Sequence, residues 1–333
     1  MARVSVIIPN YNREKLIGET LESLLAQTRP ADEIIIVDDG SSDGSIDVIR
    51  SFEPHVRLIC QENSGPAVAR NRGLAESTGD FISFFDSDDL CTADKIERQL
   101  GALEQTGGDV AYSPWLHSVF RGDTIEYSED PLQQKPLPDD HPITHWFLRG
   151  WVTVFQNMLI RRSLLTAVGP YRADLKPTED SELLFRMMLA NARFVHVPQT
   201  LMIYRIHPDN QISGSALPTE SRARDWQRYY AAILDHMAAN RDRFTRWDFL
   251  AVRANAARND RILRRLGAAG DSDFLTGRLE ALALSIPRRI REVSLGLERR
   301  RTGYSFSRPY GQAPLTADQT AMIRKLGYEP VRS

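Results

Sequence analysis

The chain has 333 residues, of which 42% are hydrophobic and 26% charged, so it is long enough to bury one large core or two smaller ones. Its 42 basic and 44 acidic residues nearly cancel, which gives no reason to expect a nucleic-acid partner. Two cysteines are too few for a disulfide framework, and no apolar run approaches the roughly 20 residues of a membrane-spanning helix. We therefore expect a cytoplasmic protein that is at most peripheral to a membrane.

The first hundred residues alternate short apolar runs with amphipathic segments. This pattern predicts βαβ units around a mainly parallel sheet. The apolar runs predict strands over 4–8, 33–37, 56–60 and 81–85. Helical spacing of apolar residues predicts crossover helices over 13–26 and 66–76.

Beyond residue 90 the pattern becomes mixed. We expect helices over 93–104 and 179–190, strands over 110–113, 155–160 and 194–198, and an exposed Pro-rich loop over 131–142. From Pro218 onward Gly and Pro become rare and helical signals dominate. We place a boundary near Ser215, which gives an α/β domain over 1–215 and a helical C-terminal domain over 216–333.

Polar residues follow the predicted strands at the points where they end. The first strand runs into Pro9-Asn10-Tyr11-Asn12-Arg13, the second into Asp38-Asp39, and the fourth into Asp86-Ser87-Asp88-Asp89. In open α/β sheets ligands bind beyond the carboxyl ends of the strands, so these residues are candidates for a binding site. Acidic side chains gathered at one edge repel each other unless a cation or hydrogen-bond donors compensate them.

The D-x-D arrangement of Asp86 and Asp88 has a specific chemical use. One carboxylate can take a divalent ion that bridges a diphosphate, and the other a ribose hydroxyl. Oxygen ligands and phosphates favour magnesium or manganese over zinc. The alternative is that Asp86 turns the chain and that Asp88 or Asp89 caps a following helix.

Several stretches resemble the family 2 glycosyltransferases in combination and in order. The resemblance begins with VSVIIPNYNREKLIGETLESLLAQTRPADEIIIVDDGSSDGS and QENSGPAVARNRGLAESTGDFISFFDSDD. It continues through NMLIRRSLLTAVG, TEDSELLFRM and YRIHPDNQIS, and it stops near Ser213. It implies a GT-A fold, a nucleoside-diphosphate sugar donor, most simply a UDP-sugar, a divalent metal (Mn or Mg), and inversion at the anomeric carbon.

The resemblance also implies roles for individual residues. It implies nucleotide-sugar binding within 1–113, and an acceptor side with the catalytic base within 114–215. The implied nucleotide-binding residues are Pro9, Tyr11, Asn12, Arg13, Asp39, Arg70 and Asp86. Asp88 and His207 correspond to metal positions, and Glu179 and Arg205 are further candidate acceptor or donor contacts. Trp151 and Gln156 lie where an acceptor pocket could form, since a flat aromatic face suits a sugar ring, but core packing explains a tryptophan equally well.

Inverting transfer needs a base, because the acceptor hydroxyl must lose its proton as it attacks the anomeric carbon. The resemblance assigns this role to Asp180, in an E-D pair at the start of a predicted helix. An alternative without catalysis is available. Thr178 is a good N-cap, and acidic side chains in a first turn are favoured by the helix dipole.

One departure from the family pattern separates this chain from polymerising relatives. Those typically carry Q-x-x-R-W with membrane helices beyond it, whereas this chain has RARDWQRYY and no membrane span. We therefore expect a transferase that adds one sugar to a glycan or lipid-linked acceptor on the cytoplasmic side of an envelope polysaccharide pathway.

The region from Ser221 to Arg301 is basic, with 18 arginines and 10 acidic residues. The arginines concentrate at Arg288, Arg289, Arg291, Arg299, Arg300 and Arg301 around a modest apolar stripe. This combination is typical of helices at a membrane surface. Packing against the acidic catalytic part, or contact within a homo-oligomer, are alternatives that stay open.

Three other protein classes would account for parts of this sequence. A signalling receiver domain would explain Asp38-Asp39 but neither Asp86-Ser87-Asp88 nor Glu179-Asp180. A dinucleotide enzyme would need G-x-G-x-x-G after the first strand, where Pro9-Asn10-Tyr11 stands. The alternative that remains is a catalytically silent protein that binds a nucleotide or glycan and acts through its helical domain.

Overall fold

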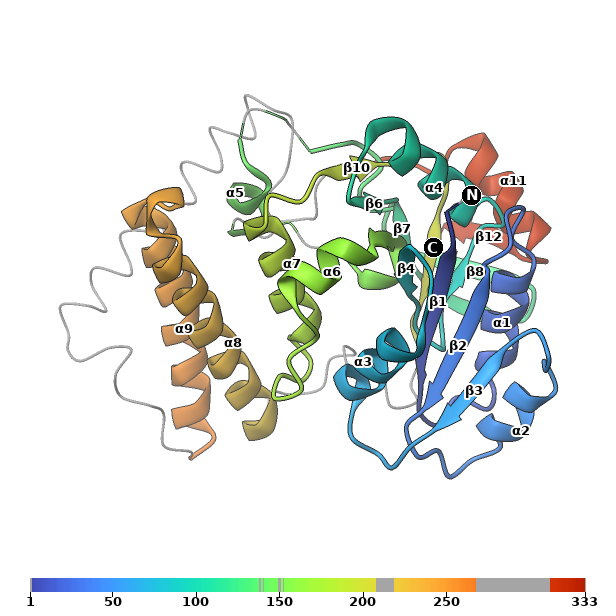
Figure 1. Ribbon diagram of the computed structural model, residues 1–333, viewed down its shortest axis with the longest axis horizontal. Coiled ribbons are helices and arrows are strands. Elements are labelled where there is room, and N and C mark those ends of the chain that lie inside the picture. The colour runs from blue at the N-terminus through green and yellow to red at the C-terminus, as the bar shows by residue number, and fades with distance from the viewer. Residues whose placement is uncertain are drawn as a thin grey trace.

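The computed structural model describes residues 2–137, 139, 141–148, 151, 153–207, 219–267 and 312–332. In this part of the chain two sheets and their covering helices form the larger body, and a pair of long helices lies to one side of it (Figure 1). The α/β fold class expected from the sequence is confirmed. Among these residues no helix is long and apolar enough to cross a membrane.

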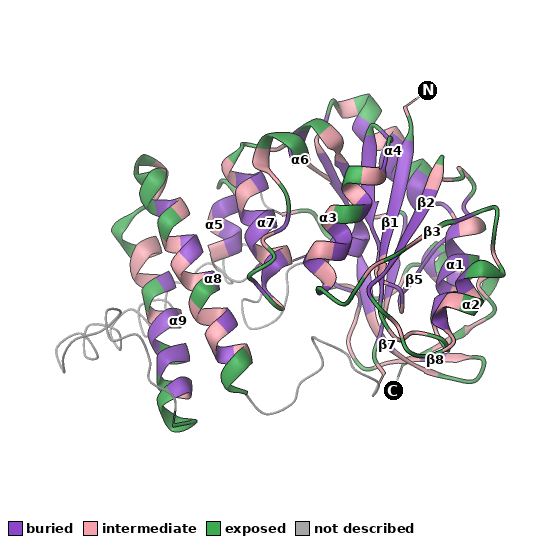
Figure 2. Ribbon diagram, turned by 60° about the horizontal axis from the view of Figure 1, so that its bottom comes forward, coloured by how far each residue is buried: buried purple, intermediate pink, exposed green. Residues whose placement is uncertain are grey.

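The larger sheet has seven strands in the order β10-β6-β9-β4-β1-β2-β3. Their bounds are β1 Val4–Asn10, β2 Glu33–Asp38, β3 Arg57–Cys60, β4 Phe81–Phe84, β6 Val110–Tyr112, β9 Met158–Arg161 and β10 Phe194–His196. Neighbours run parallel, except that β9 is antiparallel to both β4 and β6. The centre of the sheet is buried on both faces (Figure 2), which explains why β1 reads as an almost continuous apolar run.

Crossover helices connect the first strands. They are α1 Ile17–Leu25, α2 Ser45–Arg50, α3 Pro66–Glu76 and α4 Lys95–Thr106. α3 begins with Pro66 at its first position, directly after Gly65, whose φ of 92° suits glycine. It packs so closely on β1 that a Cβ on Gly73 would lie 2.3 Å from Cγ2 of Ile7.

A second sheet was not anticipated from the sequence. Its strand order is β12-β8-β7-β11-β5, with bounds β5 Leu90–Cys91, β7 Trp115–Arg121, β8 Thr124–Tyr127, β11 Met202–Arg205 and β12 Glu329–Arg332. β5 follows the acidic motif at once, and α4 begins only after its N-cap Asp94. The alternative in which Asp88 or Asp89 caps a helix is therefore wrong.

Four short helices follow in the middle of the chain. Their bounds are α5 Ile143–Leu148, the 3₁₀ turn η1 Phe155–Asn157, α6 Arg162–Val168 and α7 Glu179–Leu189. The strand expected over 155–160 is thus split into η1 and β9, and the helix expected over 13–26 begins only at Ile17. The helix expected over 179–190 agrees with α7 to one residue.

The long helices α8 Glu220–Ala239 and α9 Arg246–Arg265 pack along each other, joined by the short turn η2 Arg241–Arg243 (Figure 1). α8 also packs on α7, where His236 Nε2 lies 2.7 Å from Oε1 of the buried Glu182. Both helices begin with a threonine cap, and Thr245 forms a full capping box with Asp248.

The last described segment does not continue this helical pair. α11 Ala317–Lys325 packs beside the second sheet, and β12 pairs in parallel with β8 (Figure 1). We expected 216–333 to form one helical domain, so residues 312–332 depart from that expectation. The physical reason is that Ile323 completes an apolar cluster with Leu116 and Ile203 of the second sheet.

Candidate functional site

The carboxyl ends of β2, β1 and β4 lie side by side at one edge of the larger sheet. They bring together the polar residues that the sequence places after each strand. Pro9 is the penultimate residue of β1 and is half-buried. Tyr11 follows it with 43% of its surface exposed, so a flat aromatic face lies open at this edge.

The loops after β1 and β2 are fastened to each other. The backbone N–H of Asn12 donates to Ser41 Oγ (2.9 Å), and Ser42 N–H donates back to Asn12 Oδ1 (2.8 Å). Asp38 accepts from Ser41 and from the side chain of Asn10, so it shapes the turn. These bonds use the side chain of Asn12 within the protein.

Asp39 is 3% exposed and binds the loop that precedes α3. Its Oδ1 accepts from Gln61 Nε2 and from Ser64 N–H, both at 2.8 Å, and its Oδ2 accepts from Gly65 N–H at 2.7 Å. A carboxylate has about four acceptor sites, so one remains for a further donor such as a base N–H. Asp39 therefore fixes this loop and keeps one acceptor site for a further donor.

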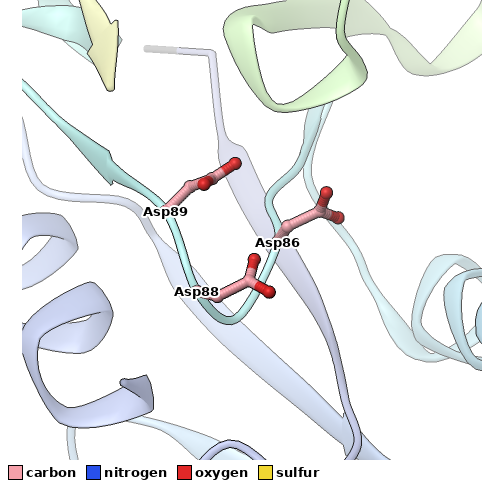
Figure 3. Close-up of side chains that lie close together, drawn as sticks. All are labelled: Asp86, Asp88 and Asp89. Atoms are coloured by element: carbon pink, nitrogen blue, oxygen red, sulfur yellow. The ribbon is translucent and has the colours of Figure 1, made fainter. Parts of the chain in front are cut away.

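Asp86, Asp88 and Asp89 gather on the turn between β4 and β5. Each offers an oxygen, and these three oxygens lie within 4.8 Å of one another. Figure 3 shows that the three side chains leave the turn on the same side. The sequence had placed Asp86 and Asp88 in the site, and Asp89 is an addition that the D-x-D spacing did not indicate.

The three carboxylates have different partners. Asp88 Oδ2 accepts from Arg13 Nε at 2.9 Å and lies 3.0 Å from His207 Nε2. Burial acts to raise the pKa of Asp88, but the hydrogen bond from His207 and the charge of Arg13 outweigh it and hold that pKa below its usual value. Burial and the charges of Asp88 and Asp86 raise the pKa of Asp89 well above its usual value.

These residues fit a hard divalent cation. They offer carboxylate oxygens at close spacing, and magnesium and manganese prefer such oxygens. Both oxygens of Asp89 are already bonded, to Gln156 Nε2 and to the N–H of Arg205. Asp86 and Asp88 are therefore the carboxylates best able to hold an ion, with His207 beside them.

Arg70 lies buried at the centre of a second acidic group. Its guanidinium donates to Asp86 (2.9 Å) and to Glu179 (3.1 Å), and it lies 3.5 Å from Oδ1 of Asp180. It stands above the ring of Tyr171, 5.4 Å from the ring centroid. One cation therefore joins the turn after β4 to the start of α7.

Asp180 belongs to this group and has a raised pKa. Burial raises its pKa to about 7; Arg70 opposes that shift, while the charges of Glu179 and Asp86 reinforce it. Thr178 stands at the N-cap of α7, but its hydroxyl makes no capping hydrogen bond. The local structure thus gives little support to a purely capping role for this segment.

Several buried polar atoms of Asp180 and the residues beside it make no hydrogen bond of regular geometry among the described residues. Such atoms are rare in native structures, and each one is unfavourable unless a ligand or water satisfies it. Their concentration marks a place for a polar ligand. They are Arg70 Nε, Tyr171 Oη, Thr178 Oγ1, Glu179 Oε2 and Asp180 Oδ1.

Three expected contacts lie elsewhere than the sequence suggested. Trp151 is 1% exposed and packs edge-on against Tyr112, so it belongs to the core rather than to an acceptor surface. Gln156 is buried, and its Nε2 donates a hydrogen bond to Oδ2 of Asp89. The side chain of Arg205 pairs with Glu19 (2.7 Å) and covers a ring of the second sheet, so only its backbone reaches the acidic turn.

Tyr171 is the site residue that sequence reasoning missed, since it had no signal beyond being an aromatic residue near a glycine and a proline. Asp89 was among the candidates after the fourth strand, but the D-x-D spacing gave it no role of its own. A separate cavity of about 360 Å³ lies on the α5 side of the larger sheet, lined by Tyr112, Trp146 and Phe194 among others. None of the carboxylates above lines it.

Comparison with known proteins agrees with this geometry. The family model "Glycosyl transferase family 2" matches residues 5–169. The glycosyltransferase YibD of Escherichia coli K12 is 47% identical over 248 residues, which cover 69% of each chain. EpsH of Bacillus subtilis 168, also named as a glycosyltransferase, is 35% identical over 61% of each chain.

A teichuronic acid biosynthesis glycosyltransferase of the same bacillus, TuaG, is 46% identical over 29% of this chain and 40% of its own. The matched part is therefore less than two thirds of the length of EpsH and of TuaG. Among solved structures, S. aureus TarS 1–349 in complex with UDP-GlcNAc has a TM-score of 0.58 at 19% identity, covering 90% of this chain and 92% of that one. This likeness shows a shared fold.

Since YibD is matched at high identity over more than two thirds of its length, this chain belongs to the family 2 glycosyltransferases.

Proposed function

We propose that this protein transfers one sugar, with inversion, from a nucleoside-diphosphate sugar to a hydroxyl of a glycan or lipid-linked acceptor. The observation that carries the proposal is Asp180, a carboxylate with a pKa of about 7 among buried polar atoms that make no hydrogen bond of regular geometry, joined through Arg70 to the acidic turn after β4. A carboxyl group of that acidity is suited to take a proton near neutral pH.

The donor nucleotide is proposed to lie along the edge formed by β2, β1 and β4. Tyr11 offers an exposed ring for the base, and Asp39 has one acceptor site left for a base N–H. We propose that Asp86 and Arg70 contact the ribose and the diphosphate, which is supported by the bond of Arg70 to Asp86 and its contact with Asp180. Pro9, Asn12 and Arg13 are proposed to line the same edge of the sheet. A UDP-sugar is the donor we propose, in keeping with the UDP-GlcNAc complex of TarS.

The reaction is a single displacement. The acceptor oxygen forms a bond to the anomeric carbon from the face opposite the leaving group, and its proton passes to Asp180. The bond between that carbon and the diphosphate oxygen breaks, so a nucleoside diphosphate leaves with the electron pair. Arg70 supports the reaction by keeping Asp180 and Asp86 in fixed relation.

Asp88 and His207, with Asp86 beside them, are the residues that would hold a magnesium or manganese ion. Such an ion supplies positive charge to the departing diphosphate. Arg13 contributes a permanent positive charge at the same carboxylate.

We propose envelope polysaccharide assembly at the cytoplasmic side as the setting, a proposal supported by the likeness to TuaG, which is named for teichuronic acid biosynthesis. Docking against an anionic membrane is the proposed role of the arginine-rich region. The six arginines from Arg288 to Arg301 that suggested it lie outside the described residues. Within the described residues, α9 adds exposed arginines that favour the same role: Arg246, Arg253, Arg258, Arg261, Arg264 and Arg265. Packing of this region in a homo-oligomer is the alternative.

A division of labour is proposed with a boundary near Ser215, the catalytic part before it and the paired helices α8 and α9 after it. The second candidate function is a silent protein that binds nucleotide or glycan without turnover. The retained carboxylates Asp86, Asp88 and Asp180 favour catalysis over that alternative.

A donor panel tests the proposal. UDP-glucose, UDP-galactose, UDP-GlcNAc, UDP-glucuronate and GDP-mannose are each incubated with the protein and magnesium or manganese, and release of nucleoside diphosphate is measured. We expect release from at least one donor, and its loss in Asp180→Asn. Asp235→Asn, an exposed change on α8, is the matched control and should leave the rate unchanged. Donor binding without release by the wild-type protein would favour the silent alternative.

A further inference from the structure

Tyr171 lies in the connection between α6 and α7, nine residues before Asp180, and its side chain is buried beside the proposed base. Its ring packs edge-on against Phe84 (5.1 Å between centroids) and beside Phe155 (5.5 Å). These contacts involve the ring alone and would be equally available to a phenylalanine. They do not involve the hydroxyl group, which acts on Asp180.

The hydroxyl of Tyr171 is buried and makes no hydrogen bond of regular geometry among the described residues. Burying a hydroxyl without a well-formed hydrogen bond is unfavourable, so a residue with only a packing role would be better without it. The hydroxyl lies close enough to the carboxyl of Asp180 to act on it, since its hydrogen-bonding influence lowers the pKa of that group. Burial and the nearby charge of Asp180 raise the pKa of Tyr171 well above its usual value, so the hydroxyl keeps its proton and can donate it to a hydrogen bond.

The backbone of Tyr171 is held in a fixed position on the α3 side. The side chain of Asn71 donates to the carbonyl of Tyr171 and accepts from its N–H, both at 2.9 Å. Asn71 directly follows Arg70, the cation that contacts Asp180. The same turn of α3 therefore positions both the guanidinium and the tyrosine.

The connection is held on the α7 side as well. Arg186 donates to the backbone carbonyls of Val168, Gly169 and Pro170, and its guanidinium is paired with Glu182. Arg186 and Glu182 belong to α7, the helix that begins with Glu179 and Asp180. Tyr171 and Asp180 are thus held in fixed relation, with the hydroxyl of Tyr171 close to the carboxyl of Asp180.

We propose that the hydroxyl of Tyr171 binds the acceptor by donating a hydrogen bond to the oxygen that Asp180 deprotonates. The inference rests on the function proposed above, since it needs an acceptor at Asp180. The acceptor oxygen has two lone pairs: one forms the new bond to the anomeric carbon, and the other accepts from Tyr171. The acceptor proton passes to Asp180, and Tyr171 keeps its own proton throughout.

The test uses the full chain with water as the acceptor and the fastest donor of the panel, UDP-GlcNAc being the first one tried. Tyr171→Phe should lower the rate of UDP release by at least tenfold, because water loses one of its two contacts. The dissociation constant for UDP should stay within twofold of the wild-type value. The melting temperature should not fall, because the ring contacts are retained and the hydroxyl that is removed makes no hydrogen bond of regular geometry.

Tyr229→Phe is the matched control, because Tyr229 is also buried but lies on α8 away from the acidic cluster. It should release UDP within twofold of the wild-type rate. Tyr171→Phe with a wild-type rate, while Asp180→Asn is impaired, would overturn the role of Tyr171 and leave the proposed function standing. A wild-type rate in Asp180→Asn, or no release from any donor by the wild-type protein, would overturn both.

Discussion

Asp180→Asn removes one charge from the group around Arg70 and keeps the size of the side chain. The pKa of Asp180 is raised from 3.8 to about 7, since burial and the charges of Glu179 and Asp86 outweigh Arg70. A difference of about three pKa units corresponds to roughly 4 kcal/mol between the two protonation states. The side chain is 31% exposed, and solvent screening reduces the effect on stability to about 1–3 kcal/mol.

The sign of the effect follows from the direction of the shift. The folded pKa lies above the unfolded one, so the folded state favours the protonated acid. Stability from this group is present below the unfolded pKa of 3.8 and is lost as the pH rises through about 7. Above pH 7 the wild-type protein carries the whole penalty and the Asn variant carries none.

We expect Asp180→Asn to be more stable than the wild type at pH 8, by about 1–3 kcal/mol, and the difference to shrink at pH 5. Urea unfolding at both pH values measures this. The same variant should lose a factor of about 10² to 10⁴ in kcat while donor binding persists. In the wild type, turnover should fall as the pH drops below about 7, because the base must be deprotonated.

If Asp180 only stabilises the start of α7, Asp180→Asn should have the opposite effect on stability and no effect on turnover. Loss of a negative charge from a first helical turn would cost about 0.3–1 kcal/mol, and turnover would be kept. A variant that is less stable than the wild type at pH 8 and still active would refute our reasoning. Asp235→Asn, which changes an exposed carboxylate, controls for the loss of one charge.

Three further expectations concern the cation, the packing of α3, and the membrane. Asp88→Asn should remove most transfer, and excess EDTA should do the same to the wild type; transfer that survives both treatments contradicts the metal role. Gly73→Ala should lower the free energy of unfolding by about 1–3 kcal/mol, because the new Cβ would clash with Ile7. Gly101→Ala on α4, where a Cβ meets nothing within 4 Å, should raise the free energy of unfolding by up to about 1 kcal/mol. Urea unfolding compares the two variants. The protein should sediment with anionic vesicles at low salt and not with neutral ones, and this binding should be lost when the exposed arginines of α9 are replaced. If the protein sediments with neither vesicle type, the arginine-rich region is better explained as an oligomer interface.

The sequence alone predicts the parallel part of the fold and the edge where the site lies. The runs that form β1, β2 and β4 are long and apolar because both faces of the sheet are covered, so they are easy to recognise. Each is followed by polar residues, and the parallel arrangement puts those residues at one edge. The convergence of Tyr11, Asp39 and Asp86 there follows from topology.

The second sheet could not be anticipated in the same way. β5 has only two residues, and β12 contains a proline and is mostly exposed, so neither has the composition of a strand. β5 is a strand because it pairs with β11, and β12 is a strand because it pairs with β8. Such pairing joins segments far apart in the sequence, and local patterns carry no information about it.

Orientation of single side chains was also beyond the sequence. A tryptophan suits a sugar surface and a core equally well, and Trp151 is in the core because Tyr112 and Phe194 surround it. Arg205 lies two residues before His207, which contacts Asp88, but the side chain of Arg205 pairs with Glu19 instead. Tyr171 gave no periodic signal, since its importance lies in one oxygen.

The proposed donor side and the proposed acceptor side of the site depend on each other for their geometry. Arg70 lies between Asp86 and Glu179, which are separated by most of the catalytic sequence. His207 bonds Asp88, and the N–H of Arg205 bonds Asp89, so the end of β11 holds the turn after β4. Residues 1–113 alone would therefore keep the strand ends but lose the partners that fix their carboxylates. For this reason a change at the end of β11 should affect donor binding and transfer together, although β11 belongs to the other sheet.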